Sequence, residues 1–298
     1  MVYLLLARFL KNINSISHKL KVSAYIPCYN NECTIGTAIE SILNQKYSVD
    51  ELIIIDDGST DKSLKIIKRY EVKHISLNKN NGRGFVRNLA INECKNEFVL
   101  CCDATNSLAP NFLDIALPCL SNNPTACSVS GPIKSLDKSD LVCRWRSRHL
   151  FKDYVLHQPN TINISSLITY GTLMKKSVIL KLGNFDPLLR HSEDEDMADR
   201  ISASNFHSLG HSDLEIICIK KNSLSEVFER YWRWNIGKKE KLSFSTYWSG
   251  IKCSLKPMAQ LDIAKKDYLA ATLSLLLPHY FLLKSLLNIL SNKSNSSI

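Results

Sequence analysis

The sequence predicts an α/β fold, in which a doubly wound, mostly parallel sheet is followed by a helical, membrane-associating C-terminal region. Short apolar runs alternate with helical patterns through the first hundred residues, and polar or acidic side chains directly follow several of those runs. The composition changes after residue 220, where basic and apolar residues dominate. With 298 residues, 45% of them hydrophobic, the chain can bury a substantial core.

The first third of the chain supplies these strands and helices in order. ELIIID (51–56) is apolar almost throughout, as strands inside a parallel sheet are. TIGTAIESILNQ (34–45) instead places Ile35 and Ile39 on one helical face. The expected strands are 21–27, 51–56, 74–78 and 97–103, and the expected helices are 34–45, 63–70 and 84–94. Parallel strands joined by helices end at one edge, so the residues after them should share a ligand site.

Composition divides the chain into an N-terminal extension (1–20), the α/β domain (21–220) and a basic, apolar helical region (221–298). The formal net charge is +10, and the stretch 220–266 holds 11 Lys and Arg against 4 Asp and Glu. Anionic lipid, a phosphorylated substrate or nucleic acid could account for this basicity, as could an ordinary solvated surface. No recognisable nucleic-acid-binding module accompanies it, so we expect no nucleic-acid partner.

The segment 268–290 is long enough to cross a bilayer as a helix and carries one full charge, Lys284. Pro278 interrupts it, which favours a bent, interfacial or re-entrant helix; a buried core helix is the alternative. The N-terminus lacks a basic region and a cleavage site. The ten cysteines lack paired CxxC spacing, which favours reduced thiols. We therefore expect a peripheral or monotopic protein at the cytoplasmic face of the cell membrane.

The loop after the first expected strand carries groups suited to a nucleoside. IPCYNNECTIG (26–36) lacks the GxGxxG pattern of dinucleotide folds, which disfavours a nicotinamide enzyme. Tyr29 offers a ring, Asn30 an amide and Glu32 an acid beside a helix start. These groups could hold a nucleoside by stacking and hydrogen bonds, and a simple Asn-rich turn is the alternative.

Two further loops point to the same kind of ligand. In IIIDDGSTD (53–61), capping of the next helix does not require Asp56, which is left free to accept hydrogen bonds from a base or ribose. NNGRGFVRN (80–88) brings Arg87 to a helix start, where phosphates bind readily.

Acidic residues mark two later positions. Asp103 follows the apolar strand in VLCCDATN (99–106), and Glu193 and Asp194 open the acidic run EDED. Crowded carboxylates raise the pKa of at least one member, which suits a general base. A solvated helix start, where acids favour the helix dipole, is the plainer interpretation.

Taken together, these segments resemble the family 2 glycosyltransferases, whose GT-A fold is Rossmann-like. The resemblance covers about residues 20–240. The motifs that carry it are, in order, IPCYNNECTIGTAIESILNQ, ELIIIDDGSTDKS, NNGRGFVRNLAI, FVLCCDATNSLAP, LGNFDPLLRHSEDEDMADRI and RYWRWNIG. The resemblance implies a nucleotide-diphosphate sugar donor, usually a uridine one, and transfer with inversion at the anomeric carbon.

The resemblance also implies roles for individual residues. Asp194 would be the general base, and Asp103 would meet the ribose or a metal-bound diphosphate. The expected donor-nucleotide residues are Pro27, Tyr29, Glu32, Asp56, Asp57, Arg87 and Asp103, and the expected acceptor or diphosphate residues are Glu193, Arg230, Arg233 and Trp234. Trp234 could instead simply pack on the core.

The sequence departs from the family at the expected metal site. Thr105 stands where the second DxD aspartate is expected, and Asn106 follows where many members carry another acid. A hydroxyl and an amide are weaker ligands for Mn²⁺ or Mg²⁺ than carboxylates. Lys220 and Lys221 could replace part of the cation's charge. We still expect a divalent cation, with Asp103 as its one clear ligand.

The sequence thus predicts an inverting glycosyltransferase that moves a sugar to a glycan or lipid-linked acceptor in surface polysaccharide biosynthesis. The alternative is a catalytically degenerate family member that binds nucleotide sugar or glycan without transfer, which Thr105 motivates. Nucleotidyl transfer is disfavoured because the first loop is neither glycine-rich nor basic. The donor sugar, the acceptor and the linkage depend on the shape of the site.

Overall fold

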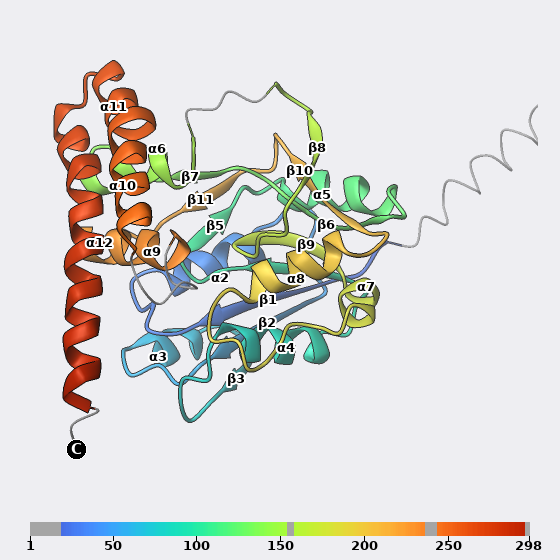
Figure 1. The fold of residues 1–298 in the computed structure, drawn as a ribbon. Helices are drawn as coiled ribbons and strands as arrows, with labels where there is room; N and C mark the ends of the chain where they lie inside the picture. The colour runs from blue at the N-terminus through green and yellow to red at the C-terminus, as the bar shows by residue number, and fades with distance from the viewer. Residues whose placement is uncertain (1–18, 154–157, 236–242, 296–298) are drawn as a thin grey trace, which may run out of the picture. The chain divides into compact units, whose positions relative to one another are not determined.

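A computed structural model describes residues 19–153, 158–235 and 243–295 (Figure 1). The chain divides into two compact units. The first unit contains residues up to 131 together with 162–214, and the second contains 132–161 and 215–298. Each unit is described by itself below. Most of the expected N-terminal extension lies outside the described residues.

The first unit is built on one eight-stranded sheet. In spatial order its strands are β3 (Lys73–Ser76), β2 (Glu51–Asp56), β1 (Val22–Cys28), β4 (Phe98–Cys102), β9 (Gly171–Lys175), β6 (Ala126–Ser130), β10 (His207–His211) and β8 (Ile162–Ser165). Strands β3, β2, β1 and β4 pair in parallel, and β10 pairs in parallel with β6. Strand β9 runs antiparallel to both of its neighbours, and β8 runs antiparallel to β10. The prediction of a mostly parallel, doubly wound sheet is confirmed.

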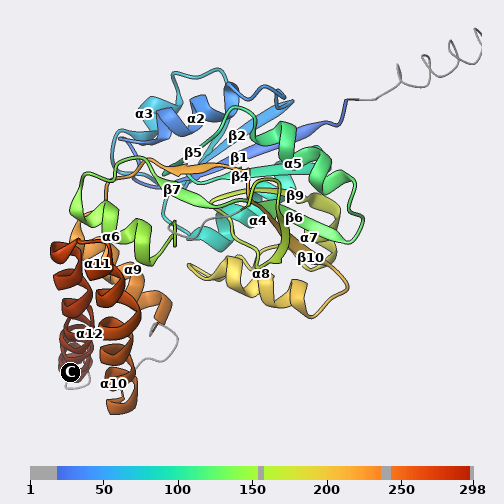
Figure 2. The ribbon, with the colours of Figure 1, turned by 90° about the horizontal axis from the view of Figure 1, so that it is seen from above.

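Helices cover both faces of this sheet, with α2 and α4 on opposite sides in Figure 2. The helices are α2 (Ile35–Leu43), α3 (Ser63–Ile67), α4 (Arg83–Glu93), α5 (Phe112–Ser121), α7 (Lys176–Lys181) and α8 (Glu193–Ser202), and the short strand β5 (Asn106–Leu108) follows β4. Alternate strand residues such as Tyr25, Ile53 and Ile55 pack with Val86 of α4 and Met197 of α8 in one buried cluster. Successive side chains of a strand point to opposite faces of the sheet, so every second residue belongs to this cluster, and the strands are buried on both faces.

The second unit is mainly helical. It contains α6 (Leu141–His149), α9 (Leu224–Asn235), α10 (Phe244–Cys253), a π-helical turn η1 (Ser254–Ala259), α11 (Gln260–Ala264) and α12 (Tyr268–Asn295), with the parallel pair β7 (Ile133–Ser135) and β11 (Ile216–Cys218). Its apolar core brings Trp145 of α6 and Phe228 of α9 against Leu277 and Phe281 of α12. The aromatic rings of Trp145 and Phe228 lie 5.6 Å apart. This core is separate from the clustered apolar side chains of the first unit.

Helix α12 continues through Pro278, which lies inside it. A proline has no N–H, so the carbonyl of Ser274, four residues earlier, loses its usual helical partner. The hydroxyl of Ser254 donates to that carbonyl at 2.6 Å. The carbonyl therefore stays hydrogen-bonded, and α12 passes the proline without ending.

A buried polar network ties α6 to α11 and α12. Asp262 is fully buried and accepts hydrogen bonds from Arg148 and from the hydroxyl of Ser274, the latter at 2.6 Å. His149 Nε2 lies 2.9 Å from the same carboxylate. Trp145 Nε1 donates to Ser274 Oγ at 2.8 Å. A buried charge that is paired and hydrogen-bonded in this way is tolerated, whereas an unpaired one is costly.

Acid should destabilise this second unit. The hydrogen bond from Arg144 lowers the pKa of Asp267 to about 2. A lowered pKa stabilises the fold above the unfolded value of 3.8, and this contribution is lost as the pH falls toward about 2. All four tryptophans belong to the second unit, so their fluorescence reports its unfolding. We expect the thermal midpoint to fall across this window, and to fall less in Asp267→Asn. Equal slopes in both proteins would contradict the prediction.

The division of the chain differs from the one expected from composition. Residues 132–161 group with the C-terminal helices, and the third and last crossing between units falls between 214 and 215 rather than at 220. Contacts such as Arg144 with Asp267 explain this grouping, because they join positions 123 residues apart. All ten cysteines are free thiols; Cys33 and Cys253 are exposed, and the others are buried.

Candidate active site

The carboxyl ends of β1, β2 and β4 lie side by side because β1 pairs in parallel with both of its neighbours. Cys28 stands opposite Asp56, and Tyr25 stands opposite Cys101. The loops that follow these strands therefore leave the sheet at one edge, the position at which ligands bind in doubly wound sheets.

The loops after β1 and β2 are joined by hydrogen bonds. Asn30 has a left-handed backbone with φ 52°, and its N–H donates to Ser59 Oγ at 2.9 Å. The N–H of Thr60 donates to Asn30 Oδ1 at 2.8 Å. The N–H of Lys62 donates to Glu32 Oε2 at 2.8 Å. One oxygen of Glu32, which we expected in a nucleoside pocket, is thus used to fix the start of α3.

Pro27 and Tyr29 lie at the same edge. Pro27 is half-buried in β1 opposite Ile55, and the ring of Tyr29 is 44% exposed in the loop that follows. An exposed ring at a strand end can stack on a planar ligand without displacing a core side chain.

The two aspartates after β2 have different surroundings. Asp57 Oδ1 accepts from the N–H of Asn81 at 2.8 Å, and Asp57 Oδ2 accepts from the N–H of Gly82 at 3.0 Å. Asp56 is buried, with Oδ2 at 3.4 Å from Ser76 Oγ. Asp56 Oδ1 has no hydrogen-bond partner within the described part of the chain. Asp57 therefore fixes the loop before α4. Asp56 Oδ1, in contrast, is an acceptor that a ligand could use.

The start of α4 is pressed against the loop that precedes α8. The N–H of Gly84 donates to the carbonyl of Leu189 at 2.9 Å. A β-carbon on Gly84 would lie 2.1 Å from the carbonyl oxygen of Asp186, so only glycine fits there. The N-cap Gly82 has φ 99°, which also favours glycine. This close approach brings Arg87, one turn into α4, next to the start of α8.

Arg87 is the centre of a buried ionic cluster. Its Nε donates to Glu193 Oε1 at 2.9 Å, one terminal nitrogen donates to Asp103 Oδ1 at 2.8 Å, and the other donates to Cys101 Sγ at 2.8 Å. Burial disfavours the charge of Arg87, but the surrounding groups, including Cys101, Asp103 and Glu193, raise its pKa well above the ordinary value. Both Arg87 and Glu193 have side chains only 1% exposed. Through these contacts, Arg87 and Glu193 hold Asp103 and the start of α8 in place.

Asp194, the expected base, follows Glu193 in the first turn of α8. It is half-buried, and its Oδ1 accepts from the N–H of Glu195 at 3.0 Å. Burial and, next, the charge of Glu193 raise the pKa of Asp194, which Arg87 partly offsets. A carboxylate with a raised pKa and one engaged oxygen can take a proton with the other.

Tyr170, just before β9, was not expected at the site. Its carbonyl accepts from Asn106 Nδ2 at 2.9 Å and from the N–H of Asp103 at 3.4 Å. Burial, and then the charges of Asp194 and Asp103, raise the pKa of its phenol to about 12. The phenol of Tyr170 therefore lies close enough to Asp194 and Asp103 for their negative charges to raise its pKa. The sequence offered one signal for Tyr170, which is that it directly precedes Gly171 and Thr172. The strands of this region were not predicted.

The strand end after β4 supplies one carboxylate where a divalent cation is expected. Asp103 already accepts from Arg87, and Thr105 offers only a hydroxyl. In the three stretches described, no group of three or more His, Cys, Asp or Glu side chains could hold a metal ion. These residues do not fit a cation bound by protein carboxylates alone.

The expected acceptor or diphosphate residues Arg230, Arg233 and Trp234 lie on α9, in the second unit. Arg230 is half-buried, and the side chains of the other two lie outside the described part. Lys220 pairs with Glu226 at 3.2 Å, and Lys221 pairs with Asp137 at 2.9 Å, all within that unit. The two lysines that could have replaced a cation's charge are thus already paired with acids.

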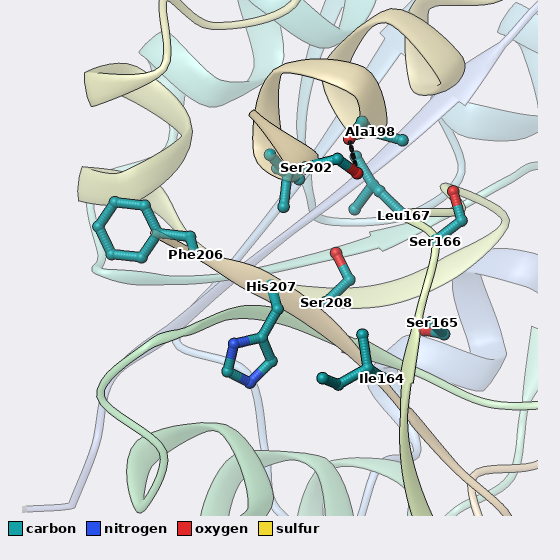
Figure 3. A pocket seen from close by; sticks show the side chains of 10 residues that line it. Ile164, Ser165, Ser166, Leu167, Ala198, Ser202, Phe206, His207 and Ser208 are labelled. Carbon is teal, nitrogen blue, oxygen red and sulfur yellow. Dashed lines mark hydrogen bonds between the residues drawn. The ribbon is translucent and has the colours of Figure 1, made fainter. Parts of the chain in front are cut away.

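A cavity of about 280 Å³ lies between β8, β10 and the end of α8 (Figure 3). Its lining is Ile164, Ser165, Ser166, Leu167, Ala198, Ile201, Ser202, Phe206, His207 and Ser208. None of the expected site residues lines it. It contacts the C-terminal half of α8, whereas Glu193 and Asp194 begin that helix.

The fold and the acidic strand ends define the class of protein as a glycosyltransferase with the GT-A fold. The model of glycosyl transferase family 2 matches residues 23–183, more than half of the chain, and the chain therefore belongs to this family. The match includes the strand ends that carry Asp56 and Asp103, and it ends before α8.

Two curated relatives are named as synthases or transferases of sugars. The poly-β-1,6-N-acetyl-D-glucosamine synthase of Staphylococcus epidermidis is 29% identical over 182 residues, which are 55% of this chain and 42% of that protein. An uncharacterized glycosyltransferase of Haemophilus influenzae is 36% identical over 107 residues, which are 34% of this chain and 43% of that protein. Each match covers less than half the length of the relative.

A solved structure supports the fold. The mannosyltransferase PcManGT of Pyrobaculum calidifontis, determined in complex with GDP-Man and Mn²⁺, superposes with a TM-score of 0.55 at 17% identity. The superposition covers 95% of this chain and 82% of that one.

Proposed function

We propose that the protein is an inverting glycosyltransferase that moves one sugar from a nucleotide-diphosphate donor, a uridine one in our expectation, to a glycan or lipid-linked acceptor. The observation that carries this proposal is the position of Asp194. It is half-buried beside the Arg87 cluster, has a raised pKa, and shares the neighbourhood of Tyr170 with Asp103. The names of the staphylococcal relatives support surface polysaccharide biosynthesis as the setting.

In the proposed reaction, an acceptor hydroxyl attacks the anomeric carbon of the donor. The new carbon–oxygen bond forms as the bond to the phosphate oxygen breaks, and the nucleoside diphosphate leaves with the electron pair. Asp194 accepts the hydroxyl proton as the attack proceeds. Its raised pKa makes it a stronger base than an ordinary carboxylate. Arg87 and Glu193 act as positioning residues, because they hold the first turn of α8 against the end of β4.

Asp56 and Asp57 are neighbours, and their substitutions should have separable effects. Asp56→Asn should weaken binding of uridine diphosphate with little loss of stability, because Asp56 Oδ1 has no partner among the described residues. Asp57→Asn should lower the free energy of unfolding by about 1–3 kcal/mol, because two N–H groups lose a charged acceptor. Calorimetric titration and urea unfolding of both variants measure the two effects. The reverse pattern, with Asp56 stabilising and Asp57 binding, would refute this division of roles.

The expected Mn²⁺ or Mg²⁺ would take most of its ligands from the donor's diphosphate and from water, since Asp103 is the one carboxylate at its strand end. Thr105→Asp should therefore strengthen Mn²⁺ binding in the presence of uridine diphosphate by about tenfold. Thr105→Asn, of similar size but uncharged, is the matched control. Titration calorimetry reads out the affinity without requiring turnover. Equal Mn²⁺ affinity in the two variants would show that position 105 does not face the cation.

Thermal unfolding with a panel of nucleotide sugars, with and without Mn²⁺, tests the donor class. We expect uridine-linked donors to raise the midpoint more than guanosine-linked ones, and nucleotide release to follow when an acceptor is added. Stabilisation by donors without release, for every acceptor tried, would favour the alternative of a binding protein without transfer, which Thr105 motivates. No stabilisation by any nucleotide sugar would overturn the proposed function.

We also propose that the protein works at the cytoplasmic face of the cell membrane. One described helix, at Tyr268–Leu287, is long and apolar enough to cross a bilayer, and 44% of its apolar window is buried in the fold. A core helix passes the same test of length and composition. The location is therefore proposed from this segment together with the basic residues that precede it.

A further inference from the structure

The two faces of α12 differ in their surroundings. The inward face is buried in the second unit and includes Ala270, Leu273, Ser274, Leu277 and Phe281. The outward face is apolar and exposed, and includes Leu269, Leu275, Leu276, Leu282, Leu283, Leu286 and Leu287. A row of exposed leucines of this length exceeds the scattered apolar residues of an ordinary surface.

An aromatic edge on α10 borders this leucine face. Tyr247 Oη lies 3.2 Å from Nδ1 of His279, which is exposed on α12 between Leu276 and Leu283. Trp248 packs edge-on against Tyr247, with ring centroids 6.3 Å apart. Figures 1 and 2 both show α10 beside α12. Tyrosine and tryptophan are the residues that favour the level of lipid headgroups.

The polar groups on the inward face argue against α12 as a transmembrane span. Ser274, in the seventh position of the helix, bonds to Asp262, which also accepts from Arg148. Placing α12 across a bilayer would carry this carboxylate and guanidinium toward the hydrocarbon, where charged side chains are costly. A helix that lies in the plane of the surface avoids this cost, since only its leucine face enters the apolar layer.

The second unit, which contains α10 and α12, carries the whole formal net charge of +10. The first unit contains 19 basic and 19 acidic residues, and the second contains 19 basic and 9 acidic residues. Lys252, Lys256, Lys265 and Lys266 are all exposed on or next to α10, η1 and α11. This charge complements an anionic surface, and it opposes the docking of a second copy of the same unit.

We propose that the leucine face of α12 and the aromatic edge of α10 dock the protein onto anionic lipid, with the axis of α12 parallel to the membrane plane. This inference rests on the proposed membrane location and specifies how the contact is made. The exposed leucines extend from Leu269 to Leu287, about 27 Å of helix.

Flotation of the full chain with vesicles tests the face. We expect binding to phosphatidylcholine vesicles to strengthen when phosphatidylglycerol is included. Leu276→Gln with Leu283→Gln should weaken that binding at least about tenfold. The matched control is Leu136→Gln with Leu188→Gln, two leucines that are 67% and 86% exposed elsewhere. Unchanged tryptophan fluorescence in each variant confirms that the second unit is folded.

Spin labels distinguish docking in the plane from spanning. In a Cys33→Ser, Cys253→Ser background, which removes the two exposed thiols, a nitroxide is placed in turn at positions 269, 276 and 283. A helix in the plane places all three labels at the same shallow depth. A spanning helix separates the first and last by about 20 Å along the membrane normal. A depth gradient of that kind would overturn the proposal.

Two other results would also overturn it. Undiminished flotation of the Leu276, Leu283 variant would show that a different surface binds lipid. Failure of the wild type to float, together with a dimer that this variant disrupts, would show that the leucine face binds a second copy. A transfer assay with a water-soluble acceptor separates both results from a failure of the proposed glycosyl transfer, because it needs no membrane.

Discussion

Asp194→Asn should reduce kcat for sugar transfer by about 10²- to 10⁴-fold while leaving the affinity for the donor nearly unchanged. The amide keeps the size of the side chain and can still accept from the N–H of Glu195. It cannot accept the proton of the acceptor hydroxyl, and so the loss falls on the chemical step. Steady-state turnover and calorimetric titration of the donor measure the two quantities.

Asp199→Asn is the matched control, because Asp199 is an exposed acid on the same helix, α8. It should leave kcat within about twofold of the wild type, as surface substitutions usually do little. A comparable decrease in both variants would indicate a general effect of charge on α8. Turnover by Asp194→Asn at the wild-type rate would remove Asp194 from the mechanism.

The pH dependence of transfer should follow the same carboxylate. Burial, and then Glu193, raise the pKa of Asp194 above 3.8, and the base works only when ionised. The rate should therefore be level at neutral pH and fall by about tenfold for each pH unit below the raised pKa. Glu193→Gln should move this descending limb to lower pH, because it removes a neighbouring negative charge. Identical limbs in both proteins would contradict the assigned cause.

Arg87→Met should lower the free energy of unfolding of the first unit by about 3–5 kcal/mol. The substitution leaves the buried Glu193 carboxylate without its cation and removes a hydrogen bond to Asp103. Far-UV circular dichroism in urea follows the loss, since all four tryptophans lie in the second unit.

Lys73→Met is the matched control for Arg87→Met. It breaks an ion pair with Glu93 whose side chains are 44% and 38% exposed, and it should cost less than about 1 kcal/mol. Adding Glu193→Met to Arg87→Met should recover part of the stability, because the uncompensated charge is gone. A loss no larger than that of Lys73→Met, or no recovery in the double variant, would refute the cluster's proposed structural role.

The parallel half of the sheet could be predicted because its strands are short, apolar and separated by amphipathic helices. The expected strand 51–56 coincides with β2, and 97–103 contains β4. Strand β9 was not predicted, because Gly171–Lys175 is a brief mixed segment whose place depends on antiparallel pairing with β4 and β6. The joining of 132–161 to the C-terminal helices likewise depends on distant contacts.

The composition of the site could be predicted better than its burial. The acids Asp56 and Asp103 could be predicted at strand ends from the order of strands and loops. The local pattern of SEDED (192–196), by contrast, is typical of a solvated helix start. Glu193 is buried because Arg87, 106 positions earlier, reaches it from α4. That pairing leaves no local periodic signal. Tyr170 was not predicted for the same reason, because its neighbours at the site come from the segment after β4 and from α8.

Gly84 has no functional group, yet its lack of a side chain is required for α4 and the loop before α8 to lie as close together as they do. With the carbonyl of Asp186 only 2.1 Å from where a β-carbon would stand, alanine at this position would have to push the loop before α8 away from α4. The distance between Arg87 and Glu193 would then widen, although neither residue had changed. Mutational tolerance here is therefore governed by a contact between backbones, which a scan of the polar residues alone would not test.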